Sequence, residues 1–152
     1  MLWSVNPGND SLGELFAYLS QSFLENFRRT AIRPRLKVME NVPDSALAPE
    51  VRHQLFLVVK EAMNNVIKHS QATEVTLSLK VVENILEIRI EDNGRGISPQ
   101  VIAQSKRHGF ANMRARVEQL GGQLVTSSEP ARGTSIRISI PSWKDLRAKP
   151  SQ

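Results

Sequence analysis

The 152-residue sequence has no cysteine and only three histidines. Neither a disulfide framework nor a thiolate metal site can therefore form, and three scattered histidines make a poor ligand set for structural zinc. Aromatic residues account for only 5% of the chain. No apolar run approaches the roughly 20 residues of a membrane-spanning helix, and the N-terminus lacks the basic start and apolar core of a signal peptide. These absences predict a soluble, cytoplasmic chain without membrane contact of its own.

The residues that are present suit one folded domain with an anionic partner. A hydrophobic content of 40% over 152 residues is enough for one core, and the chain is too short for two domains of ordinary size. The formal net charge of +5 fits a nucleic acid, a membrane surface, a nucleotide or an acidic protein as partner. Charge alone does not choose among these four.

The stretch from His53 to His69 has the periodicity of an amphipathic helix. Its apolar residues share one arc at 3.6 residues per turn, and these are Leu55, Phe56, Val59, Ala62, Met63, Val66 and Ile67. The polar residues of the other side are Glu61, Asn65, Lys68 and His69. An ordinary solvated face would give the same pattern. The pair Asn64 and Asn65 favours a functional face, because asparagine is a poor helix former in mid-helix.

Capping and turn signals divide the rest of the chain into elements. Ser11 and Glu14 form a capping box for a helix that runs to about Arg29, and Pro49 suits the first turn of the central helix. Alternating apolar residues predict strands at 33–38, 75–81, 86–90, 123–128 and 134–140. A third helix is expected at 110–120, a mobile loop at 98–108, an irregular lead-in at 1–10 and a polar tail at 142–152.

This order of elements predicts an α+β fold. It has too few strand–helix–strand units for a doubly wound parallel sheet, so a two-layer sandwich of three helices on one face of a mixed, mostly antiparallel sheet is expected. The proline at position 34 predicts that strand 33–38 lies at the sheet edge. The strand 86–90 runs directly into Asp92, Gly94 and Gly96, which places an acid and a flexible turn at its end.

Four motifs follow one another between Val51 and Pro141. They are Glu61-x-x-x-Asn65-x-x-Lys68-His69, Asp92-x-Gly94-x-Gly96, Gly109-Phe110-x-Asn112-Met113 and Gly133-Thr134. The ordered series resembles the ATP-binding domain of bacterial sensor histidine kinases, in the superfamily of gyrase, mismatch-repair and heat-shock chaperone ATPases. The glycine, the asparagine–methionine pair and an arginine are most similar to the nitrate-sensor and membrane-fluidity-sensor kinases. The resemblance implies a Bergerat-type ATP-binding catalytic domain over residues 11–141.

The resemblance also implies a role for the polar motif residues. Asp92 would accept a hydrogen bond from the exocyclic amine of adenine, and Thr134 would support it through a water. Asn65 would bind Mg²⁺ through its amide oxygen, which suits that hard cation. Glu61 would position or deprotonate the attacking group. From the residues alone, Asp92 could instead be a turn acid, because Asn-Gly is also a common hairpin signal.

The remaining motif residues would surround the nucleotide. Lys68 and His69 would meet the phosphates, although the same pair could simply stabilise the C-terminal end of the helix dipole. Gly94 and Gly96 would let the backbone approach the nucleotide, next to Ile97.

The loop that covers the phosphates in this family would be hinged at Gly109. Two positions depart from the usual pattern, because His108 replaces a glycine of many relatives and Phe110 replaces the usual leucine. Lys106, Arg107 and Arg114 flank this loop, where we expect their side chains to be solvated rather than in contact with phosphate.

The phosphoacceptor histidine of such kinases lies on a dimerisation hairpin, and none of His53, His69 or His108 lies in that motif. The lead-in Leu2–Pro7 resembles the segment that follows the hairpin, so the hairpin is expected upstream of Met1. The resemblance implies transfer of the γ-phosphate of Mg-ATP to that histidine in two-component signalling, with little self-phosphorylation by this chain. The implied partners are the hairpin and, through the whole kinase, a response regulator. The parent would be a homodimer that could be anchored in the inner membrane.

Two other functions stay open. A free-standing serine kinase of the anti-sigma-factor type shares the nucleotide motifs and lacks the hairpin, but the lead-in Leu2–Pro7 argues against it. A basic nucleic-acid-binding module would need stacking aromatics among its basic residues, whereas the phenylalanines here lie at core spacing.

Overall fold

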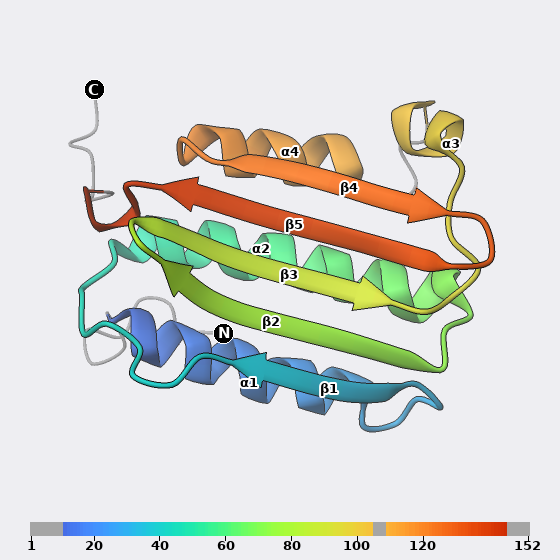
Figure 1. The fold of residues 1–152 in the computed structure, drawn as a ribbon, viewed down its shortest axis with the longest axis horizontal. Coiled ribbons are helices and arrows are strands. Elements are labelled where there is room, and N and C mark those ends of the chain that lie inside the picture. The colour runs from blue at the N-terminus through green and yellow to red at the C-terminus, as the bar shows by residue number, and fades with distance from the viewer. Residues whose placement is uncertain (1–10, 105–108, 146–152) are drawn as a thin grey trace.

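The computed structural model describes residues 11–104 and 109–145, which form a layer of helices on a five-stranded sheet (Figure 1). Its helices are α1 (Leu12–Phe27), α2 (Pro49–Asn65), the π-helical turn η3 (Val66–Ser70), α3 (Pro99–Gln104), α4 (Phe110–Gln119) and the short η4 (Trp143–Asp145). Its strands are β1 (Arg33–Val38), β2 (Glu74–Val82), β3 (Ile85–Asp92), β4 (Gln123–Glu129) and β5 (Gly133–Pro141).

The sheet is mixed and mostly antiparallel, as the sequence predicts. Its strand order is β1-β2-β3-β5-β4, with a parallel pairing between β1 and β2 and antiparallel pairings elsewhere. The proline-containing strand β1 lies at one edge, where a missing backbone N–H is tolerated. The register pairs Ile90 with Ile136 and Val75 with Asp92, so the apolar residues gather on one face and the carboxylate lies at the end of the ladder.

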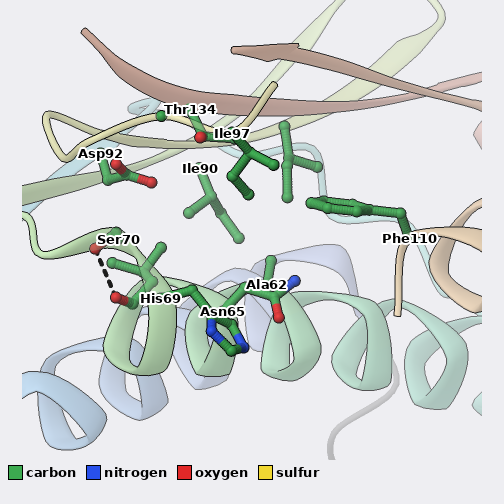
Figure 2. Close-up of a pocket in the computed structure, with 12 residues that line it drawn as sticks. Ala62, Asn65, His69, Ser70, Ile90, Asp92, Ile97, Phe110 and Thr134 are labelled. Atoms are coloured by element: carbon green, nitrogen blue, oxygen red, sulfur yellow. Dashed lines mark hydrogen bonds between the residues drawn. The ribbon is translucent and has the colours of Figure 1, made fainter. Parts of the chain in front are cut away.

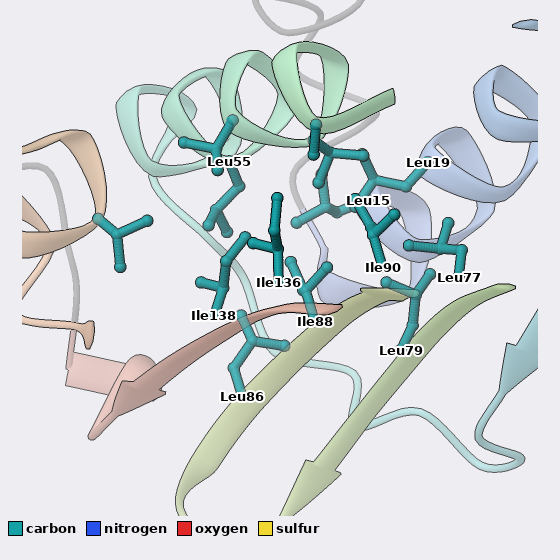
Figure 3. Close-up of a cluster of buried hydrophobic side chains, with 14 of the residues drawn as sticks. Leu15, Leu19, Leu55, Leu77, Leu79, Leu86, Ile88, Ile90, Ile136 and Ile138 are labelled. Carbon is teal, nitrogen blue, oxygen red and sulfur yellow. The ribbon is translucent and has the colours of Figure 1, made fainter. Parts of the chain in front are cut away.

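The core lies between the sheet and the helices α1, α2 and α4, which cover one face of the sheet (Figures 1 and 3). Alternate residues of β2, β3 and β5 point into it, including Leu77, Leu79, Leu86, Ile88, Ile90, Ile136 and Ile138. They pack against helix residues such as Leu15, Leu19 and Leu55. Each such side chain contributes roughly 1.5–3 kcal/mol on full burial, which makes this layer the main source of stability.

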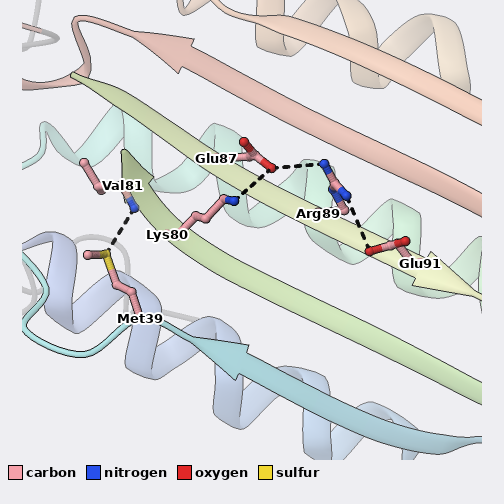
Figure 4. A network of polar contacts seen from close by, with 6 residues as sticks. All are labelled: Met39, Lys80, Val81, Glu87, Arg89 and Glu91. Atoms are coloured by element: carbon pink, nitrogen blue, oxygen red, sulfur yellow. Dashed lines mark hydrogen bonds and ion pairs between the residues drawn. The ribbon is translucent and has the colours of Figure 1, made fainter. Parts of the chain in front are cut away.

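The opposite face of the sheet is polar (Figure 4). Glu87 lies 3.3 Å from Arg89 and 4.0 Å from Lys80, and Glu91 lies 3.8 Å from Arg89. These partly exposed pairs contribute little each, because solvent screens them. Within the described ranges 11–104 and 109–145, no helix is long and apolar enough to cross a membrane.

Helix α1 begins as predicted, because the Oγ of Ser11 accepts a hydrogen bond from the backbone N–H of Glu14 at 3.1 Å. The predicted apolar arc of the central helix was partly wrong. Ile67 is 37% exposed, whereas Val58 is fully buried. Helix α2 packs against α4 as well as α1, which draws the buried arc towards Val58, and Ile67 lies in the wider turn η3.

Two further predictions differ from the structure. The expected loop at 98–108 contains the helix α3, while residues 105–108, with Lys106, Arg107 and His108, lie outside the described residues. The expected polar tail contains Trp143, which is fully buried. A tryptophan can bury a large apolar area on its own, so the fold extends beyond Pro141. The lead-in 1–10 and residues 146–152 also lie outside the described residues.

Candidate functional site

A cavity lies between the C-terminal end of α2, the turn η3 and the adjacent ends of β3 and β5 (Figure 2). It is lined by Ala62, Asn65, Val66, His69, Ser70, Ile90, Asp92, Gly96, Ile97, Phe110, Thr134 and Ile136. Its volume is about 20 Å³, which is room for one water molecule. Most of the lining residues are apolar, and a few polar groups project into the cavity.

Most of the residues that the sequence analysis assigns to the nucleotide site converge on this cavity. Seven line it, and they are Asn65, His69, Asp92, Gly96, Ile97, Phe110 and Thr134. The helix and the strands supply these groups from opposite sides, as Figure 2 shows for Asn65 and His69 below Asp92 and Thr134. Residues that are far apart in the sequence thus form one site.

Asp92 is the carboxylate of the site. Its Oδ1 accepts a hydrogen bond from the backbone N–H of Gly94 at 2.8 Å. Burial raises the pKa of Asp92 above its usual value, while the backbone amides of Gly94 and Thr134 act in the opposite direction. The net direction is upward, so the surroundings of this side chain favour the neutral form more than water does.

The hydroxyl of Ser128 connects two walls of the site. Its Oγ accepts a hydrogen bond from the backbone N–H of Ile97 at 2.6 Å and lies 2.9 Å from the Oγ1 of Thr134. Ser128 belongs to none of the four motifs. The pairing of β4 with β5 brings it next to Thr134. No local pattern in the sequence indicates this role.

Gly94 and Gly96 are required by close packing of the turn after β3. A Cβ at Gly94 would collide with the backbone carbonyl of Ser70, and one at Gly96 would collide with that of Glu129. Gly96 also has a φ of +74°, which other residues rarely adopt. These glycines hold the turn tightly between the end of η3 and the end of β4.

Glu61 and Gly109 lie together beside the cavity. A Cβ at Gly109 would lie 2.8 Å from the Oε1 of Glu61, and the φ of Gly109 is +66°. Gly109 is the residue before α4. Its lack of a side chain therefore leaves space for the Glu61 carboxylate at the start of that helix.

Lys68 and Asn65 occupy different environments although the sequence places both on the polar side of the helix. Asn65 is 8% exposed and lines the cavity. Lys68 is exposed, and among the described residues it is not part of the cavity wall.

Sequence reasoning also missed the apolar lining and a second hydroxyl, that of Ser70. Ala62, Val66, Ile90 and Ile136 belong to the regular inward faces of their elements, so periodicity could have found them. Ser70 donates a hydrogen bond to the backbone carbonyl of Val66 at 2.6 Å and accepts one from the N–H of Ala72 at 3.0 Å. It therefore shapes the end of η3.

Comparisons of the sequence with known proteins find a matching family and several relatives. Residues 50–144 match the family described as histidine kinase-, DNA gyrase B- and HSP90-like ATPase. The chain is 30% identical over 126 residues to the sensor histidine kinase LiaS of Bacillus subtilis, covering 83% of this chain and 34% of that protein. It is 33% identical over 111 residues to the sensor protein VraS of Staphylococcus epidermidis, covering 72% of this chain and 31% of that protein. The chain thus spans about a third of the length of these relatives.

A solved structure agrees with the fold. The histidine kinase domain of the blue-light activated histidine kinase from Erythrobacter litoralis superposes with a TM-score of 0.74 at 24% identity. The match covers 90% of this chain and 66% of that one. At this identity the similarity establishes the α+β architecture.

Proposed function

The chain belongs to the family of histidine kinase-, DNA gyrase B- and HSP90-like ATPases, and from this membership we propose that it is the ATP-binding catalytic domain of a bacterial sensor histidine kinase. Its reaction is transfer of the γ-phosphate of Mg-ATP to a histidine on the dimerisation hairpin of the parent kinase. The family match, the sensor-kinase relatives and the composition of the cavity support this proposal. The serine-kinase and nucleic-acid alternatives are not favoured.

The observation that carries the proposal is a half-buried carboxylate in an apolar cavity. Ile90, Ile97 and Ile136 supply apolar walls, and Asp92 supplies the hydrogen-bond acceptor. A pocket of this kind suits a flat heterocyclic base with an amine, because apolar contact gives affinity and one directed hydrogen bond gives specificity. Asp92 accordingly accepts the exocyclic amine of adenine, and Thr134 supports it.

Nucleotide binding requires the cavity to widen. A volume of about 20 Å³ holds one water and is too small for an adenine ring. Ile97 and Phe110 lie at the two ends of the segment that contains α3. Outward movement of these two side chains would open the cavity to the base, and Gly109 would hinge the loop that covers the phosphates.

The phosphates lie towards the C-terminal end of the central helix. His69 lines the cavity there, and Lys68 is an exposed cation that can turn towards phosphate. In the described part of the chain no three His, Cys, Asp or Glu side chains could together hold a metal ion. Mg²⁺ commonly takes few protein ligands and keeps phosphate oxygens and waters, so the Asn65 amide oxygen fits as a ligand.

Glu61 is the group proposed to act on the acceptor. Its carboxylate lies beside Gly109, between the helix that carries Asn65 and the hinge of the covering loop. From there it can orient the attacking histidine nitrogen or accept its proton.

The acceptor histidine belongs to the parent kinase. His53 is exposed near the start of α2, about 24 Å along the helix axis from His69 at 1.5 Å per residue. We propose that the hairpin presents its own histidine and that the whole kinase, a homodimer, then serves a response regulator. The glycine, asparagine–methionine and arginine pattern around Gly109–Arg114 supports a place in the nitrate-sensor-like subgroup, and the parent could be cytoplasmic or anchored in the inner membrane.

Calorimetry on single variants tests the proposed nucleotide site. Wild-type protein should bind Mg-ATP, and Asp92→Ala should weaken binding by about 1–3 kcal/mol, or roughly 5- to 150-fold, because the adenine amine loses its partner. Glu91→Ala is the matched control, since this neighbouring carboxylate belongs to the polar face of the sheet. Unchanged affinity in Asp92→Ala would refute the adenine assignment.

The same titrations separate the two ends of the nucleotide. Asn65→Ala should weaken binding of Mg-ATP much more than binding of adenosine, because the lost amide acts at the phosphate end. Equal losses for both ligands would contradict the proposed metal ligand.

A further inference from the structure

Arg95, in the turn after β3, joins two segments that are distant in the sequence. Its Nε donates a hydrogen bond to the backbone carbonyl of His69 at 2.8 Å. Its backbone N–H donates to the carbonyl of Ser70 at 2.8 Å, and its own carbonyl accepts from the N–H of Ala131 at 2.7 Å. One residue thus contacts both the end of η3 and the turn between β4 and β5.

The end of η3 needs these donors. The last carbonyls of a helix have no partner within the helix, and here Gln71 turns the chain away with a left-handed φ of 54°. Ser70 bonds to the carbonyl of Val66, and Arg95 supplies the donors for the carbonyls of His69 and Ser70. The guanidinium also places a positive charge at the C-terminal end of the helix dipole, where cations are favourable.

The turn η3 carries the groups assigned to the phosphate end of the site, whereas Asp92 is held by other contacts. Lys68 and His69 lie within η3. Asp92 is the last residue of β3, where it pairs with Val75 and bonds to Gly94. Loss of the Arg95 side chain would therefore loosen η3, with Lys68 and His69, while the strand pairing that holds Asp92 stays in place.

We infer that Arg95 is a positioning residue, which fixes the π-helical turn 66–70 against the adenine-side turn and so holds Lys68 and His69 where the phosphates bind. This inference rests on the proposed function for the identity of the ligand. We call the hydrogen bonds of Arg95 to the end of η3 the Arg95 clamp. The clamp does not depend on the identity of the ligand.

Hydrogen exchange without nucleotide tests the clamp directly. Arg95→Ala keeps the backbone bonds and removes the Nε donor, so amides of 66–72 should exchange roughly 3- to 10-fold faster, while those of β3 stay unchanged. Arg132→Ala is the matched control. Arg132 is another exposed arginine near the site, and its side chain pairs with the exposed Glu129 at 3.5 Å. Arg132→Ala should leave the amide exchange rates of residues 66–72 and of β3 unchanged.

Calorimetry then tests the positioning role. Arg95→Ala should weaken Mg-ATP binding by roughly 3- to 10-fold and change adenosine binding less than twofold. If Arg95→Ala leaves the amide exchange rates of 66–72 unchanged, or raises those of β3 equally, the proposed clamp is wrong. Equal weakening of both ligands would overturn the positioning role. If the wild type binds no nucleotide, the proposed function and the positioning role fail together, whereas the exchange result still decides the clamp.

Discussion

Asp92 combines a position suited to ligand recognition with an unfavourable local environment. Burial raises its pKa despite the two backbone amides that act against this shift. In its ionised form the side chain therefore reduces the free energy of unfolding of the ligand-free domain. A half-buried carboxylate with a raised pKa is typical of binding sites, where a ligand can supply a further hydrogen-bond partner.

Asp92→Asn should consequently make the ligand-free domain more stable near pH 7. Between the unfolded pKa, 3.8, and the raised folded pKa, the folded wild type binds more protons than the unfolded chain. Its stability therefore falls as pH rises through this window, and the loss is complete above the folded pKa. Asparagine does not titrate and keeps an oxygen for the Gly94 amide.

Urea unfolding at a series of pH values measures this effect. The stability difference between variant and wild type should shrink as pH falls towards 4. A variant that is less stable than wild type at pH 7, or a difference that does not vary with pH, would contradict the assigned environment of Asp92.

At the residue scale, a motif fixes both residue type and position, and four of the residues singled out in this way lie at one cavity. Asn65, His69, Asp92 and Thr134 all reach the cavity. Arg95 was not identified because it occupies an unspecified position inside the motif Asp92-x-Gly94-x-Gly96, and its partner at His69 becomes close only in the folded chain. Long-range hydrogen bonds of this kind leave no periodic or local signature in the sequence.

At the scale of single elements, the central helix shows how local geometry departs from an ideal wheel. Its last turn, η3, is π-helical, with a wider spiral than the α-helix that periodicity assumes. The prediction that Ile67 is buried is wrong because this residue lies in the π-helical turn. The helix α3 was missed because its six residues are too few for a periodic pattern, and the burial of Trp143 because one apolar residue in a polar stretch gives no pattern at all.

The N-terminal cap of α1 offers a direct test at this scale. Ser11→Ala removes the acceptor for the Glu14 N–H and should lower the free energy of unfolding by about 1 kcal/mol. Ser11→Asp is the control, since its carboxylate can replace the hydroxyl oxygen and should retain most of the stability. Chemical denaturation of the three proteins gives the comparison, and equal stability of Ser11→Ala and wild type would show that the cap contributes nothing.

At the scale of the whole molecule, the helical layer and the sheet each contribute one half of the site. The helix α2 with η3 brings Glu61, Asn65 and His69, and the ends of β3 and β5 bring Asp92 and Thr134. The overall architecture followed from alternation in the strands and helical spacing in α1, α2 and α4. Neither the small volume of the cavity nor the position of its Ile97 and Phe110 wall could be predicted, because both depend on tertiary packing.

A phosphoryl-transfer assay with the parent kinase's hairpin tests the central claim most directly. Transfer requires the acceptor to be held in line with the γ-phosphate, and such positioning supplies several kcal/mol of the rate enhancement. This chain alone should therefore remain almost unlabelled by radiolabelled ATP. With the hairpin added, the hairpin histidine should carry an acid-labile and base-stable label, and Glu61→Ala should slow transfer roughly 100-fold or more while weakening ATP binding far less. Labelling of a serine on another protein, or strong self-labelling at His53, His69 or His108, would contradict the account.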